Sequence, residues 1–252
     1  MLISIYTYIS IKLSKVLEEI LFQIAALHIY SEKYEKLITL PSDNLFINES
    51  KIFSNNPMYD YITVTDEDAK HKIIPYNQNI MLDGKFIDFK PMSEVTLNYM
   101  RNFIYSNEDY MYQAYEKYTE LRTKFGIDDD EMVSIYFEDT NTVDKRTKSY
   151  YKKALILMNK QNIVVFSENA EILNDIFDDD HNVLAVWDDN IYVRFILLSF
   201  FKYNILQYYK PYYSMWAAYI SKYQDLKTVV LPDYLKRITN TKINNMHCLY
   251  VD

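Results

Sequence analysis

Strand-length apolar runs alternate with helix-length segments from Met132 to Pro232, and this alternation most limits the fold of the chain. The runs are rich in Val, Ile and aromatic residues, and the segments between them carry apolar residues at helical spacing. The expected strands cover 132–137, 162–168, 182–187, 204–209 and 226–232, and the expected helices cover 149–161, 170–179, 192–203 and 213–221. Alternation of this kind predicts a Rossmann-like half, with a parallel sheet that helices flank.

The first half predicts a smaller α/β region. A strand over 2–9, a helix over 13–34 and a strand over 36–41 come first. Residues 42–93 are rich in turn signals and give no clear assignment. Two helices follow over 93–107 and 108–125, with a break near Ser106 and Asn107. We therefore expect an N-terminal α/β region over 1–125, a Rossmann-like half over 126–238, and a tail over 239–252 that is a coil or an edge element.

Glycine is scarce, and this excludes two nucleotide-binding motifs. The chain of 252 residues has only Gly84 and Gly126, both at natural turn positions. Neither G-x-G-x-x-G nor G-x-x-x-x-G-K-[ST] can be written in it. The 26 tyrosines accompany many Ile, Lys, Asn and Asp residues, as in products of AT-rich genomes. We interpret the tyrosines as core and boundary residues rather than as a stacking platform.

Charge argues against a nucleic-acid partner. The net charge is −8 and the calculated pI is about 5.1, whereas phosphate neutralisation needs clustered Lys and Arg. The densest basic group, 144–153, is diluted by aromatic residues. The longest apolar run, 195–209, is interrupted by Lys202 and Asn204, so no transmembrane segment is expected. The single Cys248 suits a reducing compartment, so we expect the cytoplasm, or the host-cell cytoplasm or virion for a viral chain.

Other candidate sites have simpler interpretations. Acidic runs at 128–131 and 178–180 are typical of solvated turns and helix caps, and the four histidines lie far apart, so no metal is expected. Cys248 lacks the helix-start context that would activate a thiol nucleophile. Glu138 and Asp139 are adjacent and point in opposite directions, so they cannot flank one glycosidic bond. Glu168, after the next strand, is a better partner for a retained but altered activity.

Several motifs occur in a fixed order along the chain. They are L-F-Q-x-A-A at 21–26, Y-Y-x-K-A at 150–154, F-S-E at 166–168, S-x-x-K-x-N-I at 199–205, S-x-W-x-A-Y at 214–219 and V-x-P at 230–232. In this order and spacing the chain resembles the α-1,2-fucosyltransferase family (glycosyltransferase family 11) over about four-fifths of its length. The resemblance is weakest over 42–92.

The resemblance implies a GT-B-like architecture of two Rossmann-like halves that face a cleft. The first half is the acceptor side in the family and the second is the donor side. Family members transfer fucose from GDP-fucose to a galactoside hydroxyl with inversion and without a metal, and an H-x-R-R-x-D motif holds the diphosphate. The positions equivalent to the donor cleft are Tyr136, Glu138, Asp139, Ser167, Glu168, Lys202, Ser214 and Trp216.

The chain departs from the family at the positions that would hold the donor. Tyr136 replaces the motif histidine, and Glu138 and Asp139 replace the two arginines. Arginine binds phosphate through charge-assisted, often bidentate bonds, so two acids in its place repel a diphosphate. In the family, a glycine-rich turn lets backbone amides approach the donor. This chain has side chains in that space instead, from Lys15, Val16, Glu18 and Glu19. Arg194 replaces an acidic residue, Met215 a tryptophan and Ala217 a glycine.

Two hypotheses follow from these departures. In the first, a fucosyltransferase-like scaffold has lost GDP-fucose binding and serves as a structural or interaction module with a protein or glycan partner. In the second, the chain is an active, divergent, metal-independent glycosyltransferase that uses a nucleotide sugar. The second needs compensating cations near the cleft, for which Lys202, Arg194 and Lys210 are the candidates. No catalytic residue can be named, and GDP-sugar is a cosubstrate only under the second hypothesis.

Overall fold

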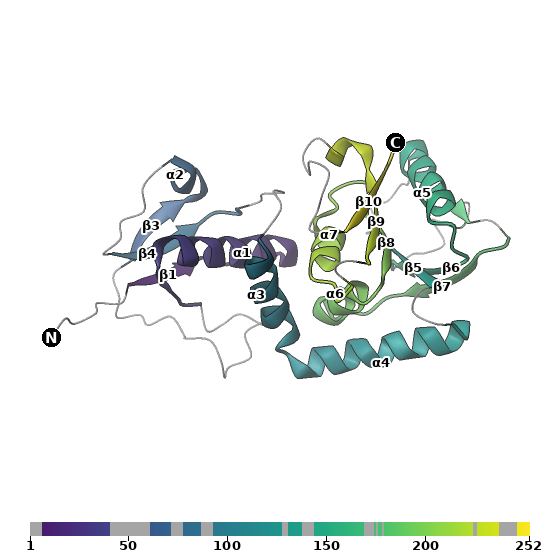
Figure 1. Cartoon of the computed structure of the whole chain (residues 1–252), viewed down its shortest axis with the longest axis horizontal. Helices are drawn as coiled ribbons and strands as arrows, with labels where there is room; N and C mark the ends of the chain where they lie inside the picture. The colour runs from purple at the N-terminus through teal and green to yellow at the C-terminus, as the bar shows by residue number, and fades with distance from the viewer. Residues whose placement is uncertain are drawn as a thin grey trace. The chain divides into compact units, whose positions relative to one another are not determined.

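The computed structural model describes residues 7–40, 61–71, 78–86, 93–127, 131–137, 144–168, 174, 176–177, 179–223, 226–236 and 246–252. The chain divides into two compact units. The first comprises Met1–Asp88 and Ser93–Asn107, and the second comprises Phe89–Met92 and Glu108–Asp252. Each unit contains a sheet with helices packed against it (Figure 1).

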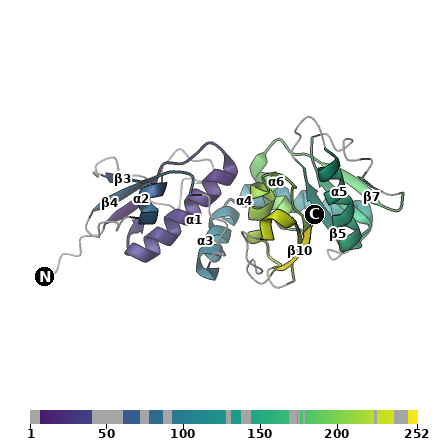
Figure 2. The same cartoon turned by 90° about the horizontal axis from the view of Figure 1, so that it is seen from above.

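The first unit holds a four-stranded sheet in which every neighbouring pair is parallel, in the order β2-β1-β4-β3. Its elements are β1 (Tyr8–Ile11), α1 (Leu17–Tyr34), β2 (Leu37–Ile38), β3 (Tyr61–Thr65), α2 (Asp66–His71), β4 (Asn79–Asp83) and α3 (Glu94–Tyr105). Ile9 and Ile11 of β1 are fully buried, and α1 packs against both β1 and α3. Both views show α1 lying along the sheet (Figures 1 and 2).

Local chemistry fixes the ends of these helices. Ser93 accepts a hydrogen bond from the backbone N–H of Thr96 and caps the start of α3. At the end of α1, Glu35 adopts a left-handed conformation with φ 51°, and its N–H donates to the Ser31 carbonyl. This closing turn lets the chain leave the helix and enter β2 two residues later.

The second unit holds a six-stranded sheet, again with every neighbouring pair parallel, in the order β10-β9-β8-β5-β6-β7. Its strands are β5 (Met132–Tyr136), β6 (Asn162–Phe166), β7 (Asn182–Val186), β8 (Tyr203–Ile205), β9 (Thr228–Pro232) and β10 (His247–Val251). Its helices are α4 (Glu108–Phe125), α5 (Lys145–Met158), α6 (Ile191–Ser199), α7 (Tyr212–Tyr219) and a short 3-10 helix at Asp233–Leu235.

Side chains of β5 alternate between two buried faces, which explains its continuous apolar sequence. Val133, Ile135 and Phe137 belong to a core with α5. Tyr136 points to the other face, where its ring contacts α7. Figure 1 shows α5 on one side of this sheet and α6 and α7 on the other. The expected α/β fold, with two parallel sheets flanked by helices, is confirmed.

Several expected boundaries were wrong. The helix expected over 192–203 ends at Ser199, and β8 begins at Tyr203 and ends at Ile205 rather than running to Tyr209. The C-cap Phe200 donates its N–H to Leu197, which closes the helix early although the apolar sequence continues. The turn-rich region over 42–93, which has no clear assignment from sequence, supplies β3 and β4. Most of the helix expected over 170–179 lies outside the described residues.

Two further elements bear on the expected domains. Within the expected tail, the residues His247–Val251 form β10, which lies at an edge of the described second sheet. Helix α4 belongs to the second compact unit, whereas the sequence placed the boundary after it, at residue 125. Tyr118 of α4 is buried, with its ring 5.4 Å from Phe201 and 5.7 Å from Phe200. The functional division into acceptor and donor halves stays a prediction.

Candidate functional site

The topology of the second sheet points to one place for a ligand. From β5 the chain moves through α5 to β6 and β7 on one side, and it then returns to β8, on the other side of β5. In open parallel sheets, ligands bind beyond the carboxyl ends of the strands at such a reversal. The carboxyl ends of β5 and β8, together with the loop over 206–211, therefore define the candidate site.

Aromatic rings fill this site on the α7 face of the sheet. Tyr136, the last residue of β5, is 3% exposed, and its ring stacks on that of Tyr213 at 4.4 Å and 23°. Tyr213 is 4% exposed and meets the Phe195 ring edge-on at 5.3 Å. Its hydroxyl donates to the Ile191 carbonyl at 2.9 Å. The position that corresponds to the motif histidine is thus part of a packed aromatic cluster.

Two tyrosines of α5 bind the strand ends from the opposite face. The Tyr150 hydroxyl lies 2.9 Å from the Leu206 carbonyl and 3.1 Å from the Val230 carbonyl, and the Tyr151 hydroxyl donates to the Tyr136 carbonyl at 3.3 Å. Burial raises the pKa of Tyr150 and of Tyr151, so both phenols stay protonated donors. Three carbonyls, at the end of β5, directly after β8 and within β9, are therefore occupied by the chain itself.

The loop after β8 extends the same cluster. The ring of Tyr208 lies 5.2 Å from that of Tyr150, and the Tyr234 hydroxyl donates to the Tyr208 carbonyl at 2.6 Å. Burial raises the pKa of Tyr234 to about 12. The Tyr209 hydroxyl donates to the Asp144 carboxylate at 3.1 Å and so ties the loop to the start of α5. We call Tyr136, Tyr150, Tyr151, Tyr208, Tyr213 and Tyr234 the tyrosine cluster.

Cations at this edge of the sheet have varied surroundings. Arg194 is buried with its guanidinium 3.6 Å from the centre of the Trp187 ring, and it donates to the Asp188 carbonyl at 3.0 Å. Asp188 also pairs with Lys117 at 2.7 Å. Lys210, in the loop after β8, is exposed. Arg194 is therefore held by contacts within the protein. Of the two candidate cations on this edge, Arg194 and Lys210, only Lys210 faces solvent.

Lys202 lies at the opposite edge of the sheet. Tyr203 pairs with Val133, so Lys202 is level with Met132 at the start of β5. Met132 precedes Tyr136 by four residues. At about 3.3 Å per residue this separates Lys202 from the carboxyl edge by about 13 Å of strand. Its ammonium group lies 5.4 Å from the centre of the Tyr203 ring. The structure therefore does not bring Lys202 together with the other family-equivalent positions.

The remaining family-equivalent positions have mainly structural surroundings. Ser167 is buried directly after β6, and Glu168 beside it is exposed. The Ser214 hydroxyl accepts from the Gln207 backbone N–H at 3.3 Å and donates to the Pro211 carbonyl at 3.2 Å, which shapes the loop after β8. Trp216 is fully buried in α7. Glu138 and Asp139 lie outside the described residues.

Side chains also occupy the turn after β1, where the family has glycines. The Gln23 amide donates to the carbonyls of Lys12 and Gly84 at 3.0 and 2.6 Å and accepts from the Ser14 N–H at 2.8 Å. Glu19 pairs with Lys85 and accepts from the Ser14 hydroxyl, and these bonds, Lys85 first, lower its pKa. Polar side chains of the chain itself thus satisfy this turn.

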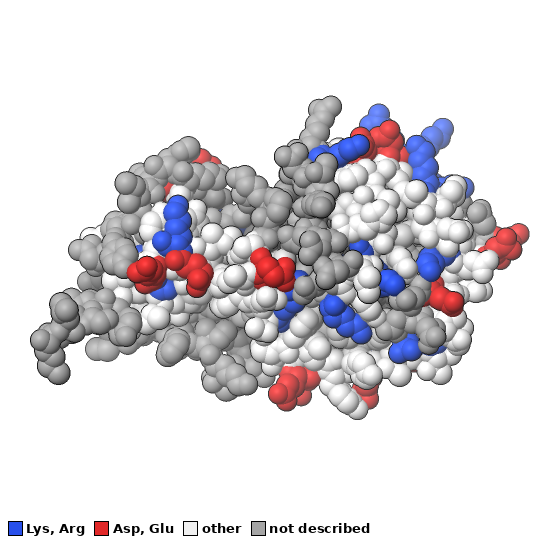
Figure 3. Space-filling view, in the orientation of Figure 1, with Lys and Arg blue, Asp and Glu red and all other residues white. Residues whose placement is uncertain are grey.

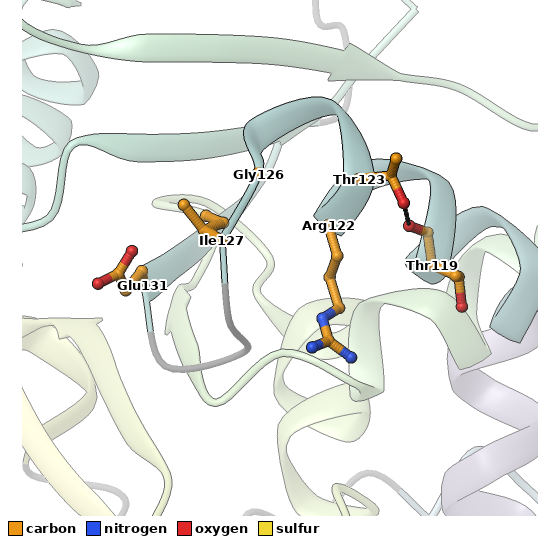
Figure 4. Close-up of a pocket in the computed structure, with 6 residues that line it drawn as sticks. All are labelled: Thr119, Arg122, Thr123, Gly126, Ile127 and Glu131. Carbon is orange, nitrogen blue, oxygen red and sulfur yellow. Dashed lines mark hydrogen bonds between the residues drawn. The ribbon is translucent and has the colours of Figure 1, made fainter.

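A hollow of about 740 Å³ lies near the other end of the second sheet, where α4 leads into β5 (Figure 4). Its lining residues are Thr119, Arg122, Thr123, Gly126, Ile127 and Glu131. Thr119 and Thr123 each donate to the carbonyl four residues earlier, and Gly126, with φ 66°, closes the helix. Figure 4 shows that Arg122 and Glu131 do not point toward one another. The lining residues that the structure describes therefore present no paired acid and base.

Other candidate chemistry is not assembled in the described part of the chain. No three His, Cys, Asp or Glu side chains within it are placed to hold a metal ion. His28 packs against Tyr99 with ring centres 4.2 Å apart, and burial lowers its pKa. On the face in Figure 3, Lys and Arg are spread over the surface rather than gathered in one patch. None of the helices described is long and apolar enough to cross a bilayer.

Comparison with known proteins supports the fold. No protein-family model matches the chain, and no curated protein matches it by sequence. The structure is similar to that of an Arabidopsis thaliana fucosyltransferase, FUT1, solved as a mutant in complex with GDP. The TM-score is 0.53 at 8% sequence identity, and the match covers 85% of this chain and 69% of the other. At this identity the likeness shows a shared fold and nothing about activity.

Sequence reasoning did not predict the tyrosine cluster as a unit. It treated the tyrosines as general core and boundary residues, and it named Tyr136, Tyr150 and Tyr151 for their places in motifs. Pairs such as Tyr150-Tyr151 and Tyr208-Tyr209 carry no periodic signal that separates a site from a core. The parallel pairing of β5 with β8 is what brings these segments together.

Proposed function

We propose that this chain is a diverged relative of the α-1,2-fucosyltransferases that has lost GDP-fucose binding and serves as a structural or interaction module. The observation that carries this proposal is the stack of Tyr136 on Tyr213 at the carboxyl end of β5. Both rings are buried there, at the place where an open parallel sheet binds its ligand. A nucleotide would have to displace a packed aromatic pair.

Electrostatics supports the same conclusion. The sequence places Glu138 and Asp139 directly after β5, where the family has two arginines. Truncating one partner of a buried charge pair already costs about 2–5 kcal/mol, so exchanging two cations for two anions should cost at least as much. The hydroxyls of four of these tyrosines donate to backbone carbonyls and supply no positive charge in place of the two arginines; they belong to Tyr150, Tyr151, Tyr213 and Tyr234.

The direct test is a thermal-shift titration of the full chain with GDP, GDP-fucose, GDP-mannose and UDP-sugars. A ligand of the folded state at about 100 times its Kd stabilises that state by about 2.7 kcal/mol and raises the Tm. We expect no shift with any of these nucleotides. A saturable rise of several degrees with one of them would contradict the proposal.

A charge-reversal variant separates the two proposed causes of lost GDP binding, which are the acidic residues after β5 and the aromatic rings that fill the site. Glu138→Arg combined with Asp139→Arg restores the family's cations but leaves Tyr136 and Tyr213 in place. We expect this variant to remain without GDP affinity in isothermal titration, because the rings still fill the site. Detectable GDP binding would show instead that the pocket is open and that charge alone was lost.

The second candidate function is an active, divergent glycosyltransferase. The similarity to a GDP-bound fucosyltransferase across 85% of this chain favours it. It needs a cation at the carboxyl edge, and the exposed Lys210 is the residue best placed to supply one. Under this hypothesis GDP raises the Tm of the wild type, and Lys210→Ala removes the shift. A shift that survives Lys210→Ala would exclude that role for the lysine.

A further inference from the structure

Strand β7 is an edge of the second sheet. It pairs with β6 on one side, and no strand among the described residues lies on its other side. Figures 1 and 2 both show it as the outermost strand of its sheet. After Asn182 it is wholly aliphatic, with Val183, Leu184, Ala185 and Val186. It has no proline or lysine of the kind that proteins use to block an edge.

The backbone phase of β7 determines which groups face outward. The Asn182 N–H donates inward to the Gln161 carbonyl at 2.8 Å. In a parallel ladder the inward residues then recur at every second position. The N–H and C=O groups of Val183, Ala185 and Trp187 therefore point away from β6. Ala185, at the centre of this row, is exposed and has a small side chain that permits close approach of another strand.

The flanking residues select the register in which a second copy can pair. If two antiparallel copies meet with Ala185 opposite Ala185, Val183 lies opposite Trp187, and His181 just before the strand comes to the same end of the pairing as Asp189 of the other copy. Each of these pairs occurs twice because the arrangement is two-fold symmetric. This register places the apolar side chains of Val183 and Trp187 together, and it brings the His181 imidazole near the Asp189 carboxylate of the other copy.

The neighbouring registers are unfavourable. Placing Val183 opposite Ala185 sets Asp180 against Asp188, and like charges directly opposite are destabilising. Placing Val183 opposite Val183 sets Asp180 against Val186 and Asp179 against Trp187, so that carboxylates face apolar side chains. The register centred on Ala185 avoids both conflicts.

We propose that β7 is a dimerisation edge, at which two copies of this chain pair antiparallel about Ala185 and join their six-stranded sheets into one continuous sheet. The added hydrogen bonds use backbone groups that β6 leaves free. Five-residue edges bury little area, so the dimer belongs to the weak, concentration-dependent class. This proposal concerns a surface apart from the tyrosine cluster and holds whether or not the chain binds nucleotides.

Sedimentation velocity of the full chain over a range of concentrations gives the first test. We expect a reversible dimer in the wild type. Ala185→Pro removes an outward N–H and no bond to β6, and Ala185→Lys sets two lysines together on the symmetry axis. Both variants should be monomeric with unchanged circular dichroism, whereas Tyr112→Lys, on the exposed face of α4, should still dimerise. A wild type that is monomeric up to its solubility limit would overturn the proposal, as would a dimer that survives Ala185→Lys.

A charge exchange tests the register. His181→Asp or Asp189→His alone brings like residues near each other and should weaken the dimer roughly threefold to tenfold. The double variant restores the pairs in exchanged positions and should recover the wild-type dissociation constant. Failure of the double variant to recover it would exclude this register.

Crosslinking gives a result that does not depend on affinity. Directly opposed residues of a hydrogen-bonded antiparallel pair have Cα atoms about 5.5 Å apart, within the range that a disulfide spans. In a Cys248→Ser background, Ala185→Cys should therefore oxidise to a covalent dimer on a non-reducing gel. Tyr112→Cys is the matched control and should remain monomeric. Equal crosslinking of the two variants would contradict pairing at β7.

Discussion

At the scale of single residues, the tyrosine hydroxyls decide how the end of the second sheet is closed. Tyr150 is fully buried and its hydroxyl contacts two carbonyls, directly after β8 and in β9. A buried carbonyl that loses its donor costs free energy because no water replaces the bond. The same side chain also fills volume between α5 and the sheet.

This makes Tyr150→Phe an informative change, because it deletes the hydroxyl and keeps the ring. We expect it to lower the free energy of unfolding by about 1–3 kcal/mol. Tyr209→Phe is the matched control, since its hydroxyl bonds an exposed carboxylate and the residue is half exposed. It should leave stability unchanged. Urea unfolding followed by circular dichroism measures both, and equal losses in the two variants would argue against this role of Tyr150.

At the scale of elements, the start of α5 depends on one carboxylate. Asp144 precedes the helix in an extended conformation and accepts from the Thr147 backbone N–H at 2.7 Å. That bond is the main reason why the pKa of Asp144 is lowered. The helix it caps carries Tyr150 and Tyr151, so this local bond supports the tyrosine cluster.

The lowered pKa gives a pH dependence with a definite sign. A carboxyl whose pKa is lower in the folded state stabilises the protein above its unfolded pKa, and this stabilisation is lost as pH falls through its folded pKa. Asp144→Asn keeps a capping oxygen but does not titrate. We expect the advantage in Tm of the wild type over Asp144→Asn to shrink between about pH 6 and about pH 3. A difference that is constant over this range would contradict the assignment.

At the scale of the whole molecule, the division into units follows packing rather than the strand–helix pattern. Helix α4 packs on α6, with Ala114, Tyr118 and Leu121 buried. Lys117 of the same helix pairs with Asp188. Both contacts lie within the second unit.

Two fragments test where the second unit begins. Residues 108–252 contain α4, and residues 126–252 begin at the boundary expected from the sequence. Urea unfolding measures the stability of both fragments. We expect the longer fragment to unfold cooperatively. The shorter one should be less stable by about 3 kcal/mol or more, because it loses the burial of Tyr118 and Leu121. Equal stability would place the boundary at residue 125 after all.

The sequence by itself determined the class of fold and the order of most elements. Apolar periodicity reports which residues a strand or helix buries, so β5, β6, β7 and β9 could be located from it. The break between α3 and α4 followed from Ser106 and Asn107. The strands β3 and β4, within 42–93, could not be located. These short strands carry little periodic signal, and the pairing of β4 with β1 that stabilises them involves residues distant in sequence.

Only the tertiary structure decided what the candidate site contains. Whether Tyr136 lines an open pocket or packs against Tyr213 depends on contacts across 77 residues, which no local pattern encodes. The placement of Lys202 at the far edge follows from the register of β8 beside β5, and a motif match does not fix register. Periodicity records burial along one element, whereas a site is made by the side chains of several elements that pairing brings together.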